Sequence, residues 1–260
     1  MYRLVPVFFL VTACCYGYGR NLVGKIVGGE ETTIEKYPYQ LSLLKGDAHF
    51  CGAILIKNNV VLTAGHCVDN ANVSDYKTRA GSSHRTHGGT ILKVKKACVH
   101  PMYMSVSNDY DVAVLLLEKP YQLSTSISTI PLQSRGVEVA TGLMGTATGW
   151  GSLVFDGPLA DVLQMVNVPK IDPTTCKNFY PEENVTARMA CYGYKKGEKD
   201  VCHGDSGGPV AVNGRVAGIA SWGYGCAFPD RPNVYTKISD REIHDFVSKF
   251  LKNTRNFVNC

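Results

Sequence analysis

Short runs of apolar and β-branched residues recur along this chain, and glycine, proline, asparagine and aspartate separate them. Runs of this length between turn-forming residues are typical of β-strands, whereas an apolar helix needs a longer stretch. The clearest runs cover residues 40–44, 52–56, 60–63, 91–94, 112–117, 208–212 and 216–221. The pattern therefore predicts an all-β protein.

One stretch near the C-terminus has the spacing of a helix instead. Between residues 239 and 251, apolar side chains recur every three or four positions, at Ile243, Phe246, Val247, Phe250 and Leu251. Ser239 or Asp240 would cap the first turn, because either side chain can accept a hydrogen bond from a free backbone N–H. We expect a C-terminal helix at 239–251.

The first residues have the pattern of a secretory signal peptide. A basic start at Arg3 precedes an apolar stretch of about ten residues at 4–13, which is too short to cross a bilayer. Cleavage is expected between Cys15 and Gly19, so that residues 1–19 form the signal. No other long apolar segment follows, and the sequence therefore predicts a secreted protein without a membrane anchor.

Length and charge limit the function classes. The 260 residues are 45% hydrophobic, which is enough to bury a large core as one or two compact units. The formal net charge is +5, but Arg3, Arg20 and Lys25 lie in segments that we expect to be removed. The basic stretch 93–96 is expected to be an exposed strand face, so we predict no nucleic-acid partner.

The run at 200–209, Asp-Val-Cys-His-Gly-Asp-Ser-Gly-Gly-Pro, places one serine in a glycine-rich turn. A serine hydroxyl becomes a nucleophile when a neighbouring base takes its proton, and its oxyanion product needs aimed backbone donors. Glycine lets the backbone present those N–H groups without a Cβ in the way. Ser206 is therefore a candidate nucleophile.

A base and an orienting carboxylate occur upstream. His66 follows the apolar run at 60–63, and Asp111 opens the run at 112–117. A carboxylate at the end of a buried strand is well placed to orient an imidazole. The remaining histidines, His49, His84, His87, His100, His203 and His244, are expected to be surface or structural residues.

These three segments, in the order His66, Asp111, Ser206, resemble those of the chymotrypsin-like serine proteases, the trypsin family. Further likeness lies at 26–29 (Ile-Val-Gly-Gly), 147–151 (Ala-Thr-Gly-Trp-Gly), 221–223 (Ser-Trp-Gly) and 232–236 (Pro-Asn-Val-Tyr-Thr), so it extends from Ile26 to about Phe250. The resemblance implies a peptidase domain at 26–260. It would contain two six-stranded antiparallel β-barrels, at about 26–130 and 131–240, with the active site in the cleft between them.

The resemblance also implies a serine endopeptidase that works by acyl-enzyme chemistry and needs no cofactor. The backbone N–H groups of Gly204 and Ser206 would form the oxyanion hole. Cleavage after Lys25 would remove a propeptide at 20–25, and the new amino group of Ile26 would bind Asp205. The uncut chain would then be a weakly active zymogen, activated by a trypsin-like protease or by itself.

Specificity is expected to depend on Asp200, which by resemblance lies at the base of the primary pocket and favours Arg or Lys in the substrate. Ser221, Trp222 and Gly223 would bind the substrate as an added strand. Asn233 departs from the family pattern, because trypsins typically carry glycine there, and Val201 is unusually apolar. We expect trypsin-like preference with a narrowed pocket, and the alternative is chymotrypsin- or elastase-like cleavage.

The cysteines are interpreted as disulfides because the chain is expected to be secreted. Cys14 and Cys15 belong to the leader. The resemblance pairs Cys51 with Cys67, Cys176 with Cys191, and Cys202 with Cys226. Cys98 and Cys260 depart from the common pattern. We expect them to pair with each other, and an intermolecular bond through Cys260 is the alternative.

Two sequons, at Asn72 and Asn184, are expected to carry glycans in a secreted protein. No metal is expected, because His84 and His87 have no further ligands nearby and no carboxylate occurs between Asp75 and Asp109. The expected partners are protein substrates, the activating protease and protein inhibitors of a monomeric enzyme. A second function class is a protease-like binding protein without catalysis, although such proteins usually lose a residue that this chain retains.

Overall fold

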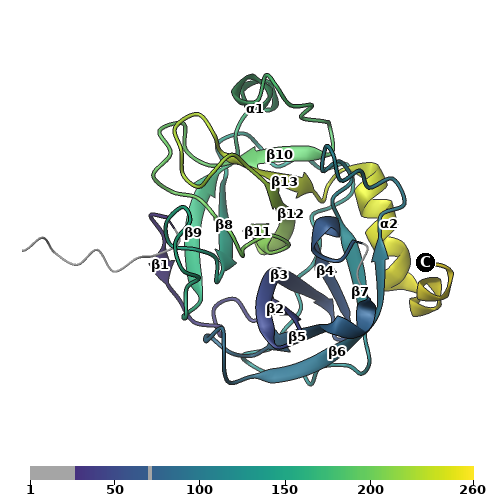
Figure 1. Cartoon of the computed structure of the whole chain (residues 1–260). Helices are drawn as coiled ribbons and strands as arrows, with labels where there is room; N and C mark the ends of the chain where they lie inside the picture. Colours follow the sequence, from purple (N-terminus) through teal and green to yellow (C-terminus); the bar gives the residue numbers. More distant parts are fainter. Residues whose placement is uncertain (1–26, 70–71) are drawn as a thin grey trace, which may run out of the picture.

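The structure is a computed structural model that describes residues 27–69 and 72–260. It consists mostly of β-strands arranged in two units, with a helix packed beside the first unit (Figure 1). The all-β prediction is confirmed. The expected signal peptide, the propeptide, Lys25 and Ile26 lie outside the described residues.

The first unit is a closed antiparallel barrel in the order β2-β3-β4-β7-β6-β5. Its strands are β2 (Gln40–Lys45), β3 (Ala48–Lys57), β4 (Val60–Thr63), β5 (Tyr76–Ala80), β6 (Thr90–Val99) and β7 (Ala113–Leu117). Each of the predicted runs in this half overlaps a strand, and only Val112 lies outside one. β4 and β7 are buried over almost their whole length, which explains why they have continuous apolar runs rather than alternation.

The second unit is a sheet in the order β1-β9-β8-β11-β12-β13-β10. Its strands are β1 (Glu30–Glu31), β8 (Met144–Gly149), β9 (Gln164–Pro169), β10 (Met189–Tyr192), β11 (Pro209–Val212), β12 (Arg215–Trp222) and β13 (Asn233–Lys237). It differs from the expected six-stranded barrel because β1 adds a seventh strand beside β9. The ends of β9 and β10 nevertheless meet through a bridge between Lys170 and Tyr192, and Gly193 N donates to Pro169 O at 3.1 Å.

The C-terminal helix α2 (Arg241–Lys252) confirms the prediction of a helix at 239–251. Asp240 is its cap and accepts hydrogen bonds from Glu242 N and Ile243 N. The helix buries four apolar side chains against the core of the first barrel: Ile243, Phe246, Val247 and Phe250. A 3-10 turn, η3 (Thr254–Asn259), follows it.

A second helix, α1 (Pro173–Phe179), was not expected from the sequence pattern. It buries only Cys176, so its residues show no apolar periodicity. Its signal is local instead, since Asp172 caps the first turn and Pro173 occupies the first helical position. No helix among the described residues is long and apolar enough to cross a membrane.

Four disulfides connect these elements: Cys51–Cys67, Cys98–Cys260, Cys176–Cys191 and Cys202–Cys226. Cys98–Cys260 joins β6 to the C-terminal residue across a sequence separation of 162. In this structure Cys260 is therefore bonded within the chain. The bond holds the segment after α2 against the barrel that carries His66.

Candidate active site

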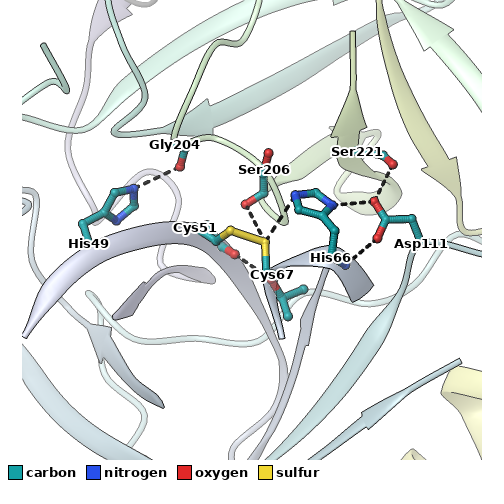
Figure 2. Close-up of a disulfide and its surroundings, with 10 residues drawn as sticks. His49, Cys51, His66, Cys67, Asp111, Gly204, Ser206 and Ser221 are labelled. Carbon is teal, nitrogen blue, oxygen red and sulfur yellow. Dashed lines mark hydrogen bonds and ion pairs between the residues drawn. A yellow bond between two sulfur atoms is a disulfide. The ribbon is translucent and has the colours of Figure 1, made fainter. Parts of the chain in front are cut away.

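Strand pairing brings His66 and Asp111 together. His66 lies in a 3-10 turn, η1 (Gly65–Cys67), directly after β4, and Asp111 lies two residues before β7. Since Thr63 of β4 faces Ala113 of β7, the two ends are adjacent. Asp111 Oδ2 lies 2.8 Å from His66 Nδ1, and His66 N donates to Asp111 Oδ1 at 2.8 Å (Figure 2).

The second unit also holds Asp111, which is fully buried. Ser221 Oγ, from β12, donates to Asp111 Oδ2 at 2.5 Å, and Thr236 Oγ1, from β13, donates to its backbone oxygen at 2.7 Å. Burial lowers the pKa of His66, but the hydrogen bond and negative charge of Asp111 outweigh burial and hold that pKa above its usual value. The hydrogen bond at Nδ1 therefore fixes the orientation of the imidazole ring, and the raised pKa makes Nε2 a better proton acceptor.

Ser206 lies in the turn before β11 and is half-buried. Its carbonyl oxygen accepts a hydrogen bond from Gly52 N of β3 at 2.7 Å, which anchors the turn to the first barrel. Cys67 Sγ lies 3.8 Å from Ser206 O and 3.7 Å from His66 Nε2 (Figure 2). In the described part of the chain, no hydrogen bond joins the hydroxyl of Ser206 to His66. Such bonds are often long before substrate binds.

Glycine is required where the turn approaches the first barrel. Gly207 has φ +80°, and a Cβ there would lie 2.2 Å from Thr63 Oγ1. Gly204 has φ +93°, and a Cβ there would lie 2.7 Å from Leu159 Cδ2. A larger residue at Gly207 would push the turn away from the first barrel, and one at Gly204 would collide with the loop between β8 and β9, so both glycines set the position of Ser206.

His49, which lies on β3 like Gly52, gives the turn a second contact to the first barrel that the sequence did not indicate. Its Nε2 lies 3.0 Å from Gly204 O, and its Nδ1 lies 2.8 Å from Ser42 Oγ. Burial lowers the pKa of His49 to about 4, so the ring is neutral near pH 7. A carbonyl only accepts, so Nε2 carries the proton and Nδ1 accepts from Ser42. A histidine within a strand gave no signal in the sequence for this contact, which joins residues 155 positions apart.

Asp205 is almost completely buried beside the nucleophile. Its carboxylate accepts hydrogen bonds from Gly151 N at 2.8 Å and Cys202 N at 2.9 Å. Burial raises the pKa of Asp205 to about 6. A Cβ on Gly149 or Gly151 would lie within 2.3 Å of this carboxylate, which explains the two glycines in the run 147–151.

A pocket of about 170 Å³ opens beside Ser206. Among its lining residues are Val201, Ser221, Trp222, Gly223, Cys226 and Asn233. Within the described ranges, Asp200 is not part of this lining, because it is only 1% exposed. Asn233 Nδ2 lies 3.4 Å from Val201 O, so its amide occupies the pocket wall next to Asp200.

The carboxyl of Asp200 accepts hydrogen bonds from Val201 N at 2.9 Å and Ala227 N at 3.3 Å. Burial nevertheless raises the pKa of Asp200 to about 8, and the bonds from Ala227, Val201 and the Asn233 side chain oppose that rise. A neighbouring cation would stabilise the ionised form.

One group of candidate metal ligands occurs within residues 27–69 and 72–260: Cys51, His66 and Cys67. Both sulfur atoms of this group are joined in a disulfide, so they are not available as thiolate ligands. His84 and His87 stack with ring centroids 4.3 Å apart. The sequon residues Asn72 and Asn184 are both exposed.

Comparisons with known proteins agree with the geometry. The family model described as Trypsin matches residues 26–247. The vitellin-degrading protease of Bombyx mori is 40% identical over 89% of this chain and 87% of its own length. Trypsin 5G1 of Aedes aegypti is 39% identical over 87% of this chain and 85% of its own. A trypsin of Simulium vittatum is 41% identical over 83% of this chain and 89% of its own length.

The closed barrel, the second sheet and the contacts that bring His66, Asp111 and the turn of Ser206 together agree with a serine endopeptidase, the class to which the matched relatives belong. The chain belongs to the trypsin family, and it is a trypsin-like serine endopeptidase with protein substrates.

Proposed function

We propose that the chain is the secreted zymogen of an endopeptidase that cleaves peptide bonds after Arg or Lys, with His66, Asp111 and Ser206 as its catalytic residues. The catalytic assignment depends mainly on one observation: Asp111 is hydrogen-bonded to both His66 and Ser221. The turn that contains Ser206 is anchored to the first barrel beside this group. These contacts orient a base next to the candidate nucleophile.

In the proposed reaction, Ser206 Oγ attacks the carbonyl carbon of the scissile bond while His66 Nε2 takes the hydroxyl proton. The carbonyl π-bond becomes an oxyanion, which the N–H groups of Gly204 and Ser206 bind. When the intermediate collapses, the C–N bond breaks and His66 gives its proton to the leaving amine. Water then hydrolyses the ester by the same proton path. Asp111 keeps the Nδ1 proton directed to itself and stabilises the imidazolium.

Activation is proposed to begin with cleavage after Lys25. Asp200 N donates to Val27 O at 3.1 Å, so the chain directly after Ile26 runs beside the pocket wall. A buried carboxylate such as Asp205, whose pKa burial raises to about 6, is strongly stabilised by a cationic partner. The new amino group of Ile26 would supply it and would order the turn that contains Gly204.

The preference for Arg or Lys is proposed from Asp200, because a buried carboxyl beside the pocket is stabilised by a bound cation. The relatives named trypsin in Aedes and Simulium support this preference. Asn233 and Val201, which line the same pocket, favour a narrowed site. They also support the second candidate, chymotrypsin- or elastase-like cleavage of neutral side chains.

Secretion and glycosylation complete the proposal. The apolar stretch at 4–13 would direct export, and the exposed Asn72 and Asn184 would carry glycans. Four disulfides are consistent with an oxidising compartment. We further propose a monomer that protein inhibitors of serine proteases would recognise.

The test is labelling of the chain with a fluorophosphonate before and after cleavage at Lys25, beside a Ser206→Ala variant. We expect strong labelling only after cleavage and none in the variant. A positional peptide library then measures which substrate residue the cleaved enzyme prefers before the scissile bond. Absence of labelling in the cleaved chain would refute catalysis and favour the non-catalytic binding protein, whereas preference for Phe, Tyr or Leu would refute the Arg/Lys assignment alone.

A further inference from the structure

The segment that delivers Asp111 has an unfavourable backbone conformation. Asn108 has φ 49° and Tyr110 has φ 55°, in the left-handed region that residues other than glycine rarely adopt. Such a conformation persists where surrounding contacts hold it. Because Tyr110 directly precedes Asp111, the contacts that hold Tyr110 also determine where the Asp111 carboxylate lies.

Arg188 makes the principal contact to this segment. Its Nε donates to Asp109 Oδ1 at 2.9 Å and its Nη2 donates to Asp109 Oδ2 at 2.6 Å. Thr186 Oγ1 also donates to Asp109 Oδ1, at 2.9 Å. A paired contact of this kind fixes direction as well as distance. Burial raises the pKa of Asp109, but these bonds outweigh burial and hold its pKa below the usual value, so the carboxylate is charged.

The same guanidinium contacts Tyr110. Arg188 Cζ lies 4.3 Å from the centre of the Tyr110 ring, and His100 stacks on that ring at 4.6 Å. Tyr110 Oη donates to Glu242 Oε2 at 2.6 Å, and Arg188 Nη1 lies 3.7 Å from the same oxygen. Arg188 therefore joins both residues that precede Asp111 to the first turn of α2.

We propose that Arg188 is a positioning residue for the catalytic carboxylate: through Asp109 and Tyr110 it holds Asp111 in the orientation that binds His66. The inference rests on the proposed function, in which Asp111 orients His66. Without the guanidinium, Asp109 loses its paired bonds and the left-handed turn at Tyr110 loses one face of its support. The 2.8 Å contact between Asp111 and His66 then becomes less well aligned.

The experiment compares Arg188→Ala and Arg188→Lys with a matched control, Arg135→Ala. Arg135 also forms a paired contact with a carboxylate on α2, through Nε and Nη2 to Asp245 at 2.6 Å and 2.7 Å. That pair is exposed, and no contact in the described structure joins it to residues 108–111. Active-site titration of each cleaved enzyme counts the folded sites, so that kcat is expressed per site.

We expect Arg188→Ala to lower kcat per site by about 10- to 100-fold, because small misalignments of a catalytic group have effects of this size. KM should change by less than about twofold, since the substrate pocket is untouched. The acid limb of the pH profile should shift to lower pH, because Asp111 is the group that raises the pKa of His66. Asp69 and Tyr103 are the other titratable residues that line the pocket beside His66. Both are unchanged in every variant, so they would not cause a difference in the acid limb between variants.

Arg188→Lys keeps the charge but cannot make both bonds, so it should give an intermediate kcat and provides the comparison if Arg188→Ala does not fold. Arg135→Ala should match the unmodified enzyme. An unchanged kcat per site and acid limb in the Arg188 variants, or an equal loss in Arg135→Ala, would overturn the inference. In those cases the parent enzyme still reacts with the fluorophosphonate, whereas failure of the parent to react overturns the proposed function with it.

Discussion

Replacing Asn233 with glycine tests how the pocket selects a substrate side chain. Asn233 lines the pocket, and its Nδ2 lies 3.4 Å from Val201 O, at the wall next to the buried Asp200. Glycine removes the carboxamide and leaves a route to the carboxyl. A substrate Arg or Lys should then contact Asp200 directly instead of meeting a neutral amide.

The size of the effect follows from the hydrogen bond that the substrate cation would form with Asp200. A hydrogen bond to a charged group contributes about 1.5–3 kcal/mol, which corresponds to roughly 10- to 100-fold in kcat/KM. A substrate with Tyr in the same position carries no cation to pair with the Asp200 carboxylate. Asn233 begins β13, and glycine in a strand costs about 0.5–1 kcal/mol of stability, which is small for a domain with four disulfides. The variant should therefore fold.

The assay measures kcat/KM for three peptides that differ only in carrying Arg, Lys or Tyr before the cleaved bond. We expect Asn233→Gly to raise the ratio of Arg to Tyr cleavage by roughly 10- to 100-fold. Asn233→Ala, which keeps the β carbon, should change the ratio in the same direction by less. Equal effects on the Arg and Tyr peptides would refute the reasoning, because the amide would then not lie between the substrate and Asp200.

Three further results are expected. Benzamidine, a cation, should bind more tightly when the nearby Asp200 is ionised. Because burial raises the pKa of Asp200 to about 8, the inhibition constant should increase as pH falls below 8, and Asp200→Asn should remove this dependence. Asp111→Asn should lower kcat and move the acid limb of the pH profile to lower pH, since the bond and charge that raise the pKa of His66 are lost; an unmoved limb would argue against that pairing. Cys260→Ser should lower the free energy of unfolding by about 2–4 kcal/mol in guanidinium titrations; an unchanged midpoint would show that the bond to Cys98 does not stabilise the fold.

The sequence was sufficient for many of the local elements. Apolar runs predicted β2, β3, β4, β6, β7, β11 and β12, and the helical spacing at 239–251 together with Asp240 predicted α2. It was insufficient for α1, since a short helix that buries one side chain leaves no periodic signal. It also did not show that β1 adds to the second sheet, because a two-residue strand depends on its partner rather than on its own pattern.

For the active site, the sequence by itself determined which residues can do the chemistry: Ser206 in its glycine turn, His66 after a buried strand and Asp111 before another. Only the tertiary structure decided how they are held. Ser221 bonds to Asp111, His49 supports Gly204, and Asn233 rather than Asp200 faces the pocket. These contacts join residues far apart in the chain. Composition and spacing carry no information about which distant side chains the two β units bring within hydrogen-bonding distance.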